Sequence, residues 1–275
     1  MTAIRNVGPS PFQAVGDYSV ESSAPARAVF SADYQNPKIH AAGILPYAFD
    51  GHRTVVLLSQ HDSSDEKHPE NTDVWEGFGG FQESGHTLVE TAFEELEEES
   101  RKLFHLTYDT VDKHGMVAFV QQNRYFQLMA RIEYDPVLPA IFRNTFVQHD
   151  DTVARTEELG SGVRKIYVTE NINPKPGSVY NSCMEKLALR WIPLKDLVHD
   201  LKYTKCSVVI DKNGKETCIP RCSVWDRENE EDLRLRPAFI ATMSSFVDAA
   251  PDVVAQVIHQ TITKHDSSVM VTSRQ

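Results

Sequence analysis

The chain has 275 residues, of which 41% are hydrophobic and 24% charged, and its formal net charge is −11. Such an acidic chain lacks the excess of Lys and Arg that tight, sequence-independent nucleic-acid binding needs, although a metal ion would still let it bind a nucleotide. No apolar run approaches the roughly 18 residues that span a bilayer, and the N-terminus lacks the apolar core of a secretory signal. We therefore expect a cytoplasmic protein with access to the nucleus left open, and no membrane partner.

The first 36 residues are rich in Pro, Ser, Ala and Gly without an apolar period, which predicts a flexible arm. Two apolar runs follow at 41–49 and 54–60, and the Asp50-Gly51 pair between them is typical of a turn that joins two strands. The second run is almost wholly apolar, which predicts a strand buried on both faces of a sheet.

The remaining elements are expected in an order of strands, helix, strands and helix. We predict a short strand at 74–75, a glycine loop, a helix at 87–102, strands at 116–120 and 124–134, a helix at 139–150, a loop at 152–163, a strand at 164–171, and a strand, turn and helix at 187–201. A hairpin turning at Asn213-Gly214, a charged link at 227–236 and helices at 237–250 and 251–265 complete the chain.

This order predicts an α/β domain with a central mixed sheet at 37–201, after the arm at 1–36. Residues 202–275 would form a C-terminal extension that either packs on the domain or makes a homodimer contact. The cysteines at 206, 218 and 222 lack the paired spacing of a structural zinc site, so we expect free thiols.

The stretch 75–103 carries the chemistry. Gly79 and Gly80 open a short polar loop, and the helix after it holds six glutamates within two and a half turns. On a helical wheel, Glu95, Glu98 and Glu99 share an arc of roughly 100° beside the apolar face, whereas the other three glutamates point elsewhere. A solvated acidic helix is the alternative interpretation.

A hard divalent cation with oxygen ligands would relieve the repulsion among these three carboxylates. Such a site suits Mg²⁺ or Mn²⁺ and the hydrolysis of a phosphoanhydride, in which the metal neutralises charge and activates water. Glu98 or Glu99 would also serve as the base, and Gly79 and Gly80 would let the backbone approach the diphosphate.

The same stretch resembles the signature of the Nudix hydrolases, which is G, five residues, E, seven residues and R-E-U-x-E-E-x-G-U, with U apolar. With Gly80 as the first glycine, Glu95, Glu98 and Glu99 match the signature glutamates, and the resemblance covers about 25 residues. It implies a Nudix-like α/β/α sandwich and a metal-dependent hydrolase of a nucleoside diphosphate linked to another group. ADP-ribose, a dinucleoside polyphosphate and a capped RNA end are among the substrates it leaves open.

Three positions depart from the signature. His86 and Glu94 stand where the family has Glu and Arg, and Arg101 stands where it has Gly. We hypothesise that His86 and Glu94 form a bridge of inverted polarity that braces the loop against the helix. The departures also motivate an alternative, in which a catalytically impaired domain serves as a nucleotide- or protein-binding module.

Other parts of the chain offer further candidates. A base outside the signature would come from the Gly-flanked loop TEELGSG, where Glu158 is the preferred residue over Glu157. Five aromatic residues could stack on a nucleobase, and four arginines could contact phosphates, but the sequence does not choose among them: Tyr47, Phe49, Trp75, Tyr125, Phe126, Arg124, Arg143, Arg155 and Arg164.

Overall fold

The computed structural model describes eleven stretches of the chain, namely residues 4–6, 27–29, 34–61, 73–111, 115–121, 124–147, 152–159, 163–171, 186–210, 214–259 and 269–272. Most of the arm predicted at 1–36 therefore lies outside the described residues, as does Cys183.

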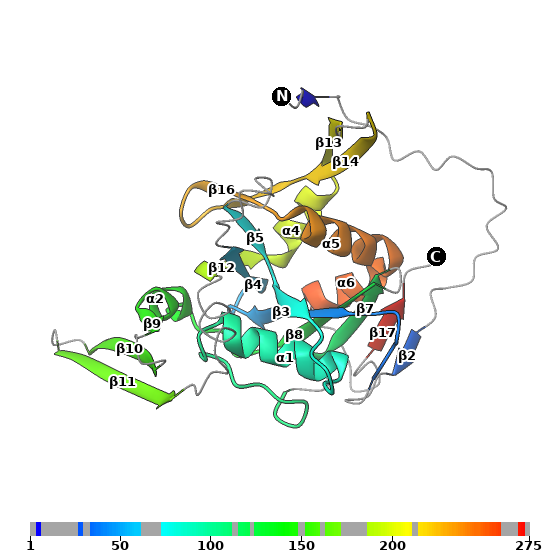
Figure 1. Ribbon diagram of the computed structural model, residues 1–275. Coiled ribbons are helices and arrows are strands. Elements are labelled where there is room, and N and C mark those ends of the chain that lie inside the picture. The colour runs from blue at the N-terminus through cyan, green and yellow to red at the C-terminus, as the bar shows by residue number, and fades with distance from the viewer. Residues whose placement is uncertain are drawn as a thin grey trace.

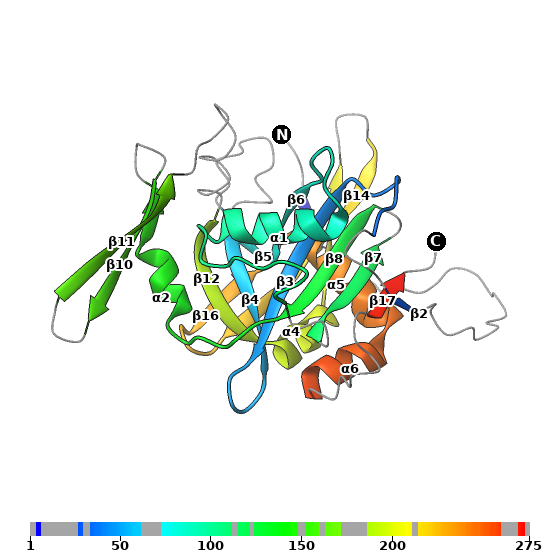
Figure 2. The same cartoon turned by 90° about the horizontal axis from the view of Figure 1, so that it is seen from below.

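A nine-stranded mixed sheet forms the centre of the molecule (Figures 1 and 2). Its main path, in spatial order, is β12 (Lys186–Pro193), β4 (Thr54–His61), β3 (Ala41–Phe49), β8 (Tyr125–Arg131), β7 (Val117–Gln121), β17 (Val269–Thr272) and β2 (Arg27–Val29). Two short strands join it at the side, β5 (Val74–Glu76) on β4 and β6 (Phe78–Phe81) on β3. The β3–β8 and β7–β17 pairs are parallel and the other pairs antiparallel, so the expected mixed sheet is confirmed.

The strands at the centre of the sheet are buried on both faces. In β4, Val56 and Leu58 belong to the core on one side, and Val55 and Leu57 belong to the core on the other. This division follows from the two-residue period of a strand, which sends successive side chains to opposite faces. The nearly continuous apolar run of β4 thus reflects a sheet covered on both sides, as predicted.

Helices cover both faces and complete the α/β/α sandwich that the sequence predicts. On one side lies α1 (Leu88–Glu99), and on the other lie α4 (Leu194–Leu201), α5 (Pro237–Ala249) and α6 (Pro251–His259), as Figure 2 shows. Within the described part of the chain, no single helix is long and apolar enough to cross a membrane. Helices α5 and α6 taken together are long and apolar enough, but a bend of 98° separates them.

Local sequence sets both ends of α1. Thr87 accepts a hydrogen bond from the Glu90 backbone amide, and the Glu90 carboxylate accepts one from the Thr87 amide, which is a complete capping box. The helix ends at Glu99, three residues before the predicted end. Beyond it, the Lys102 amide donates to the Glu97 carbonyl and the Arg101 amide donates to the Glu98 carbonyl. These two bonds are the Schellman pattern of helix termination.

The structure corrects several element predictions. The expected loop at 152–163 contains β10 (Thr152–Leu159), which pairs with β9 (Thr145–Val147) and with β11 (Val163–Asn171) in a separate sheet. The helix predicted at 139–150 is the shorter α2 (Leu138–Arg143) followed by β9. The expected charged link at 227–236 lies in the hairpin of β15 (Ser223–Asp226) and β16 (Glu231–Arg234).

The hairpin predicted around Gly214 is present as β13 (Lys205–Ile210) and β14 (Glu216–Arg221), with β1 (Ile4–Asn6) paired to β13. Gly214 has φ +79°, the left-handed conformation that an Asn-Gly turn uses. The prediction of free thiols was wrong for two cysteines of this hairpin, because Cys206 and Cys218 form a disulfide with a Cα–Cα distance of 5.5 Å. Cys222 is a buried free thiol.

Candidate active site

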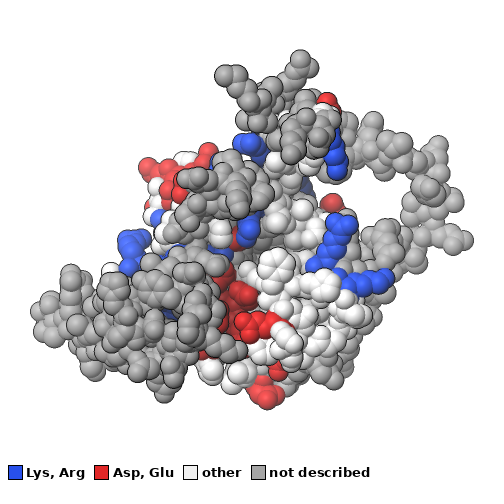
Figure 3. All heavy atoms as spheres, in the orientation of Figure 1, with Lys and Arg blue, Asp and Glu red and all other residues white. Residues whose placement is uncertain are grey.

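A pocket of about 570 Å³ opens between the central sheet, α1 and α5. The β6 backbone and the α1 glutamates form one side, Gln121, Tyr125 and Gln127 come from β7 and β8, and the start of α5 forms the opposite wall. In Figure 3, acidic atoms gather near the middle of the face, close to the place that α1 takes in Figure 1. The pocket is thus shared between the predicted domain and the C-terminal extension.

The glycine pair lies in a strand, where the sequence predicted a loop. Gly79 and Gly80 belong to β6 and face Gly43 and Ala42 of β3 in register. A side chain at Gly80 would collide with the Glu95 carboxylate, and one at Gly79 would approach the Tyr125 hydroxyl at 2.6 Å. Gly79 therefore needs glycine because a side chain there would also meet the backbone of Ala42 and Gly43, whereas a side chain at Gly80 would displace the flexible end of Glu95.

The six glutamates of α1 fall into two groups of three, as the helical wheel predicts. Glu95, Glu98 and Glu99 all line the pocket, where Glu95 and Glu98 are half-buried and Glu99 is fully buried. The other three have partners elsewhere: Glu90 in the capping box, Glu94 with His86, and Glu97 with Lys102 and His105. The structure therefore brings the three signature glutamates together, but it gives Glu99 an environment unlike that of the other two.

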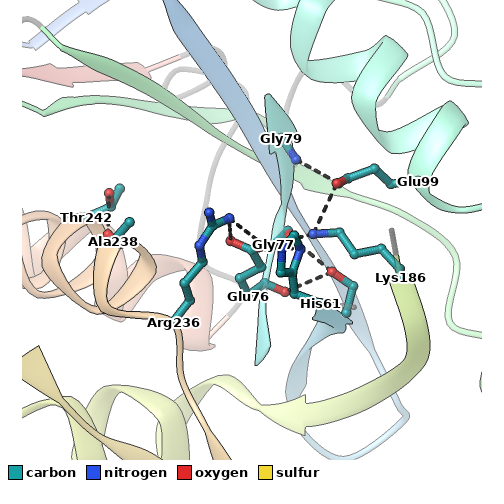
Figure 4. A network of polar contacts seen from close by, with 10 residues as sticks. His61, Glu76, Gly77, Gly79, Glu99, Lys186, Arg236, Ala238 and Thr242 are labelled. Atoms are coloured by element: carbon teal, nitrogen blue, oxygen red, sulfur yellow. Dashed lines mark hydrogen bonds and ion pairs between the residues drawn. The ribbon is translucent and has the colours of Figure 1, made fainter. Parts of the chain in front are cut away.

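The carboxylate of Glu99 belongs to a buried network of charges (Figure 4). One of its oxygens accepts a hydrogen bond from the Gly79 amide at 2.9 Å, and the other lies 3.1 Å from the Lys186 ammonium. Lys186 is only 1% exposed and also reaches Glu76 at 2.8 Å. Arg236 then contacts both oxygens of Glu76 at 2.9 Å. Two carboxylates and two cations thus neutralise one another beneath the pocket floor.

This network shifts the ionisation of its members. Burial tends to raise the pKa of Glu76, but the charges of Lys186 and Arg236 outweigh it, so that the pKa is lowered. Burial dominates at Glu99 and raises its pKa to about 7, against the opposing charge of Lys186. Burial alone would lower the pKa of Lys186, yet the two carboxylates raise it to about 12. Glu76 and Lys186 are therefore a charged pair at neutral pH.

Sequence reasoning missed the partners in this network. Glu76, Lys186 and Arg236 come from β5, the first residue of β12 and the residue before α5. The sequence separations are 110 residues for Glu76–Lys186 and 160 for Glu76–Arg236, so no local pattern joins them. The one local signal is a charged residue at the end of each apolar run, Glu76 after Val74-Trp75 and Lys186 before Leu187.

The hypothesised contact between His86 and Glu94 is present. The His86 Nδ1 atom lies 2.6 Å from a carboxylate oxygen of Glu94, and both side chains are partly exposed. Burial raises the pKa of Glu94, which the facing His86 partly offsets. The loop before α1 is therefore joined to the second turn of the helix by a pair of inverted polarity.

Arg101 holds the glycine position of the signature. Its φ is +57°, the left-handed conformation that glycine adopts most easily. Its buried guanidinium donates hydrogen bonds to three carbonyl groups, those of Phe142, Thr145 and Lys186. Arg101 thus lacks the conformational freedom of glycine, but its hydrogen bonds link the end of α1 to α2 and β12.

The remaining candidates from the sequence are Glu158, five aromatic residues and four arginines, and of these Tyr125 lines the pocket. Glu158 belongs to strand β10, and Figures 1 and 2 both show its sheet projecting from the central one. Its side chain is outside the described part, so its role as a base stays a prediction. Among the five aromatic candidates, Tyr125 lines the pocket, whereas Tyr47, Trp75 and Phe126 are core residues. Among the described side chains, Arg236 is the arginine that lines the pocket, and Arg124 and Arg143 do not line it. The side chains of Arg155 and Arg164 lie outside the described part.

The donor set fits a cation that needs few protein ligands. Among the described residues, no group of three or more His, Cys, Asp or Glu side chains is arranged to hold a metal. Glu95 and Glu98 nevertheless face the same pocket from adjacent turns of α1. Mg²⁺ commonly binds to one or two carboxylates and completes its shell with water and substrate phosphates. The pocket therefore suits a Mg²⁺ ion that arrives with, or is completed by, a phosphate ligand.

No protein-family model matches the sequence, and no curated protein matches it. Solved structures of similar fold include a MutT/nudix family protein from Enterococcus faecalis, with 10% identity over 82% of this chain and 68% of that one, at a TM-score of 0.35. An Ap4A hydrolase from C. elegans has 13% identity over 58% of this chain and 83% of that one, at a TM-score of 0.31.

The NUDIX domain of Shewanella oneidensis NrtR, solved with ADP ribose, has 11% identity over 60% of this chain and 79% of that one, at a TM-score of 0.29. In the present chain a mixed sheet lies between helix layers, and α1 carries Glu95, Glu98 and Glu99 beside β6. The roles of individual residues rest on their own contacts, because the identities and TM-scores are low.

Proposed function

We propose that this protein is a Mg²⁺- or Mn²⁺-dependent hydrolase that cleaves a phosphoanhydride bond in a nucleoside diphosphate linked to a second group. One observation carries the proposal. The pocket places two half-buried carboxylates, Glu95 and Glu98, beside the glycine backbone of β6 and within the same cavity as Arg236. That combination supports binding of a cation and a diphosphate together.

We assign separate roles to Glu95, Glu98 and Arg236 in this reaction. Glu95 and Glu98 would hold the cation, which when bound neutralises charge on the diphosphate and makes water easier to deprotonate. Glu98 is our candidate for the base, because it is half-exposed to the pocket and Glu99 has both oxygens engaged. The side chain of Arg236 is 30% exposed, and its guanidinium offers a hydrogen-bond donor to phosphate oxygens.

The substrate classes that we propose are ADP-ribose, dinucleoside polyphosphates and a capped RNA end. The pocket volume of about 570 Å³ lies within the range of small-molecule sites, which supports a nucleotide-sized ligand. Tyr125, Gln121 and Gln127 add an aromatic ring and two amides to the pocket lining. These groups can contact a base or ribose while the diphosphate lies near β6.

Substitution of Glu98 tests the proposal. The full chain is incubated with a panel of these compounds, with and without Mg²⁺ or Mn²⁺, and the products are separated by chromatography. We expect metal-dependent cleavage of at least one compound, and Glu98→Gln should lower the rate by about 100-fold or more. Glu97→Gln is the matched control, because Glu97 is a neighbour on the same helix whose partners are Lys102 and His105.

Two results would contradict the proposal. One is full activity in Glu98→Gln, and the other is tight binding of a nucleotide diphosphate without turnover at any metal concentration. The second result would instead favour the binding module that the altered signature positions suggest.

A further inference from the structure

Lys186 occupies a position between two carboxylates that belong to the pocket lining. Its ammonium nitrogen lies 2.8 Å from Glu76 and 3.1 Å from Glu99, and the side chain is 1% exposed. Figure 4 shows it reaching between the two acids from the start of β12. A buried ammonium needs compensating charge, and here two carboxylates supply it. Joining two carboxylates is also what a bound divalent cation does.

Every carboxylate oxygen of Glu76 and Glu99 is in contact with another group of the protein. Glu76 has one oxygen near Lys186, Arg236 and His61, and its second oxygen is held by Arg236. Glu99 has one oxygen on Lys186 and the other on the Gly79 amide. Each of these four oxygens therefore has a partner supplied by the chain.

The charges of the pocket separate into an inner and an outer set. In the inner set, two acidic side chains, Glu76 and Glu99, are in contact with two basic ones, Lys186 and Arg236. The outer set consists of Glu95 and Glu98, which carry two negative charges on the exposed side of α1. A single divalent cation would neutralise the outer set.

We infer that Lys186 is a built-in cation that fills the inner position of the site, so that the protein binds one divalent ion, at Glu95 and Glu98. In this arrangement Glu99 is a positioning residue: it fixes the β6 backbone through Gly79 and ties it to β12 through Lys186. The inference rests on the proposed metal-dependent function and adds the number of ions and the residues that hold them.

Titration of the full chain with Mn²⁺, followed by electron paramagnetic resonance, measures the number of bound ions directly. We expect one Mn²⁺ per chain. Two neighbouring glutamates then serve as a matched pair of variants. Glu98→Gln should weaken Mn²⁺ binding at least tenfold, whereas Glu99→Gln should leave the affinity within about threefold of the original, because its carboxylate is not a ligand.

Replacement of the lysine tests the inner position itself. Lys186→Met leaves Glu99 without its cation and Glu76 with only Arg236 and His61, which creates a vacancy for a second ion. We expect two Mn²⁺ per chain in this variant, together with a rise in Tm on adding Mn²⁺ that exceeds the rise in the original protein. Lys186→Met/Glu99→Gln removes the uncompensated charge as well, and it should return to one ion.

The outcomes separate this inference from the proposed function. Two ions in the original protein, or equal loss of Mn²⁺ in the Glu98 and Glu99 variants, would overturn the inference and leave a metal-dependent hydrolase intact. One ion in a folded Lys186→Met variant would overturn the role of Lys186. No Mn²⁺ binding at millimolar concentration would overturn the metal dependence itself. If Lys186→Met folds only in the presence of Mn²⁺, the ion has replaced the lysine and the inference holds.

Discussion

Arg101 has a left-handed backbone conformation, which glycine adopts more easily than a residue with a side chain does. A left-handed conformation costs a residue with a Cβ atom roughly 1–2 kcal/mol. Three hydrogen bonds from the guanidinium to buried carbonyl groups oppose that cost. Since a hydrogen bond to a charged group contributes about 1.5–3 kcal/mol, the contacts outweigh the strain. The departure from the signature glycine is therefore compatible with a well-terminated α1.

Substitutions at Arg101 can measure the two effects separately. Arg101→Gly removes the hydrogen bonds but also the strain, and we expect it to lower the free energy of unfolding by about 2–4 kcal/mol. Arg101→Ala removes the hydrogen bonds and keeps the strain, so it should cost about 1 kcal/mol more than the glycine variant. Urea denaturation of the two variants checks the order. An alanine variant as stable as the original protein would refute this account.

The sequence could identify Glu95, Glu98 and Glu99 because their spacing on a helix is a local property. It could not identify Lys186 or Arg236, whose partner Glu76 is more than a hundred residues away. For the same reason it assigned Glu99 to the metal without anticipating that a buried lysine would engage it. Charge compensation between distant strands depends on which elements the fold brings together, and a local pattern does not specify partners 110 or 160 residues apart.

At the scale of elements, α1 begins where its capping box dictates. Thr87 closes the first turn through its side chain, and Glu90 returns a hydrogen bond to the Thr87 backbone. The backbone bond from Thr87 lowers the pKa of Glu90, which keeps its carboxylate ionised near the positive end of the helix dipole. The start of α1 thereby sets the position of the pocket glutamates two and three turns later.

Removal of the cap should weaken the whole protein by a small and predictable amount. Thr87→Ala is expected to lower the free energy of unfolding by about 1 kcal/mol, because one orphan amide of the first turn loses its partner. Thr87→Ser keeps the hydroxyl and should recover most of that loss. Thermal or urea unfolding of the pair checks the expectation, and equal stabilities for alanine and serine would show that the cap contributes nothing.

Elements with a strong apolar period were predicted well, and those without one were not. Strands β3, β4, β7 and β8 and helix α1 lie within a few residues of their expected limits. The hairpin of β15 and β16 was missed because each strand has only four residues, half of the eight are charged, and Val224 and Leu233 are its buried hydrophobic side chains. Strand β6 was taken for a loop because two of its four residues are glycine.

At the scale of the molecule, the last helices cover one face of the central sheet. Ile240, Met243 and Phe246 of α5 belong to the same buried core as Leu45 and Phe119 of the sheet. Each such side chain contributes about 1.5–3 kcal/mol on full burial. The segment 202–275 therefore stabilises the sheet as well as supplying Arg236 to the pocket.

A chain truncated after residue 201 should accordingly lose its cooperative fold. We expect loss of the near-ultraviolet circular dichroism signal and strong binding of a hydrophobic dye, because the sheet face covered by α5 and α6 becomes exposed. A chain that begins at residue 27 retains both helices and is the matched control, which should unfold cooperatively. Cooperative unfolding of the chain truncated after residue 201 would show that the core closes without the extension.

The span of sequence between Glu76 and Arg236 has a consequence for biosynthesis. A ribosome adds about 5–20 residues per second, so the 160 positions between these partners correspond to roughly 10–30 seconds of translation. During that interval the first carboxylate has been made and its arginine has not. The strands around Glu76 can pair early, whereas the contact between Glu76 and Arg236 forms only after residue 236 has emerged. The buried charge network of the pocket is thus completed later than the strands that surround Glu76.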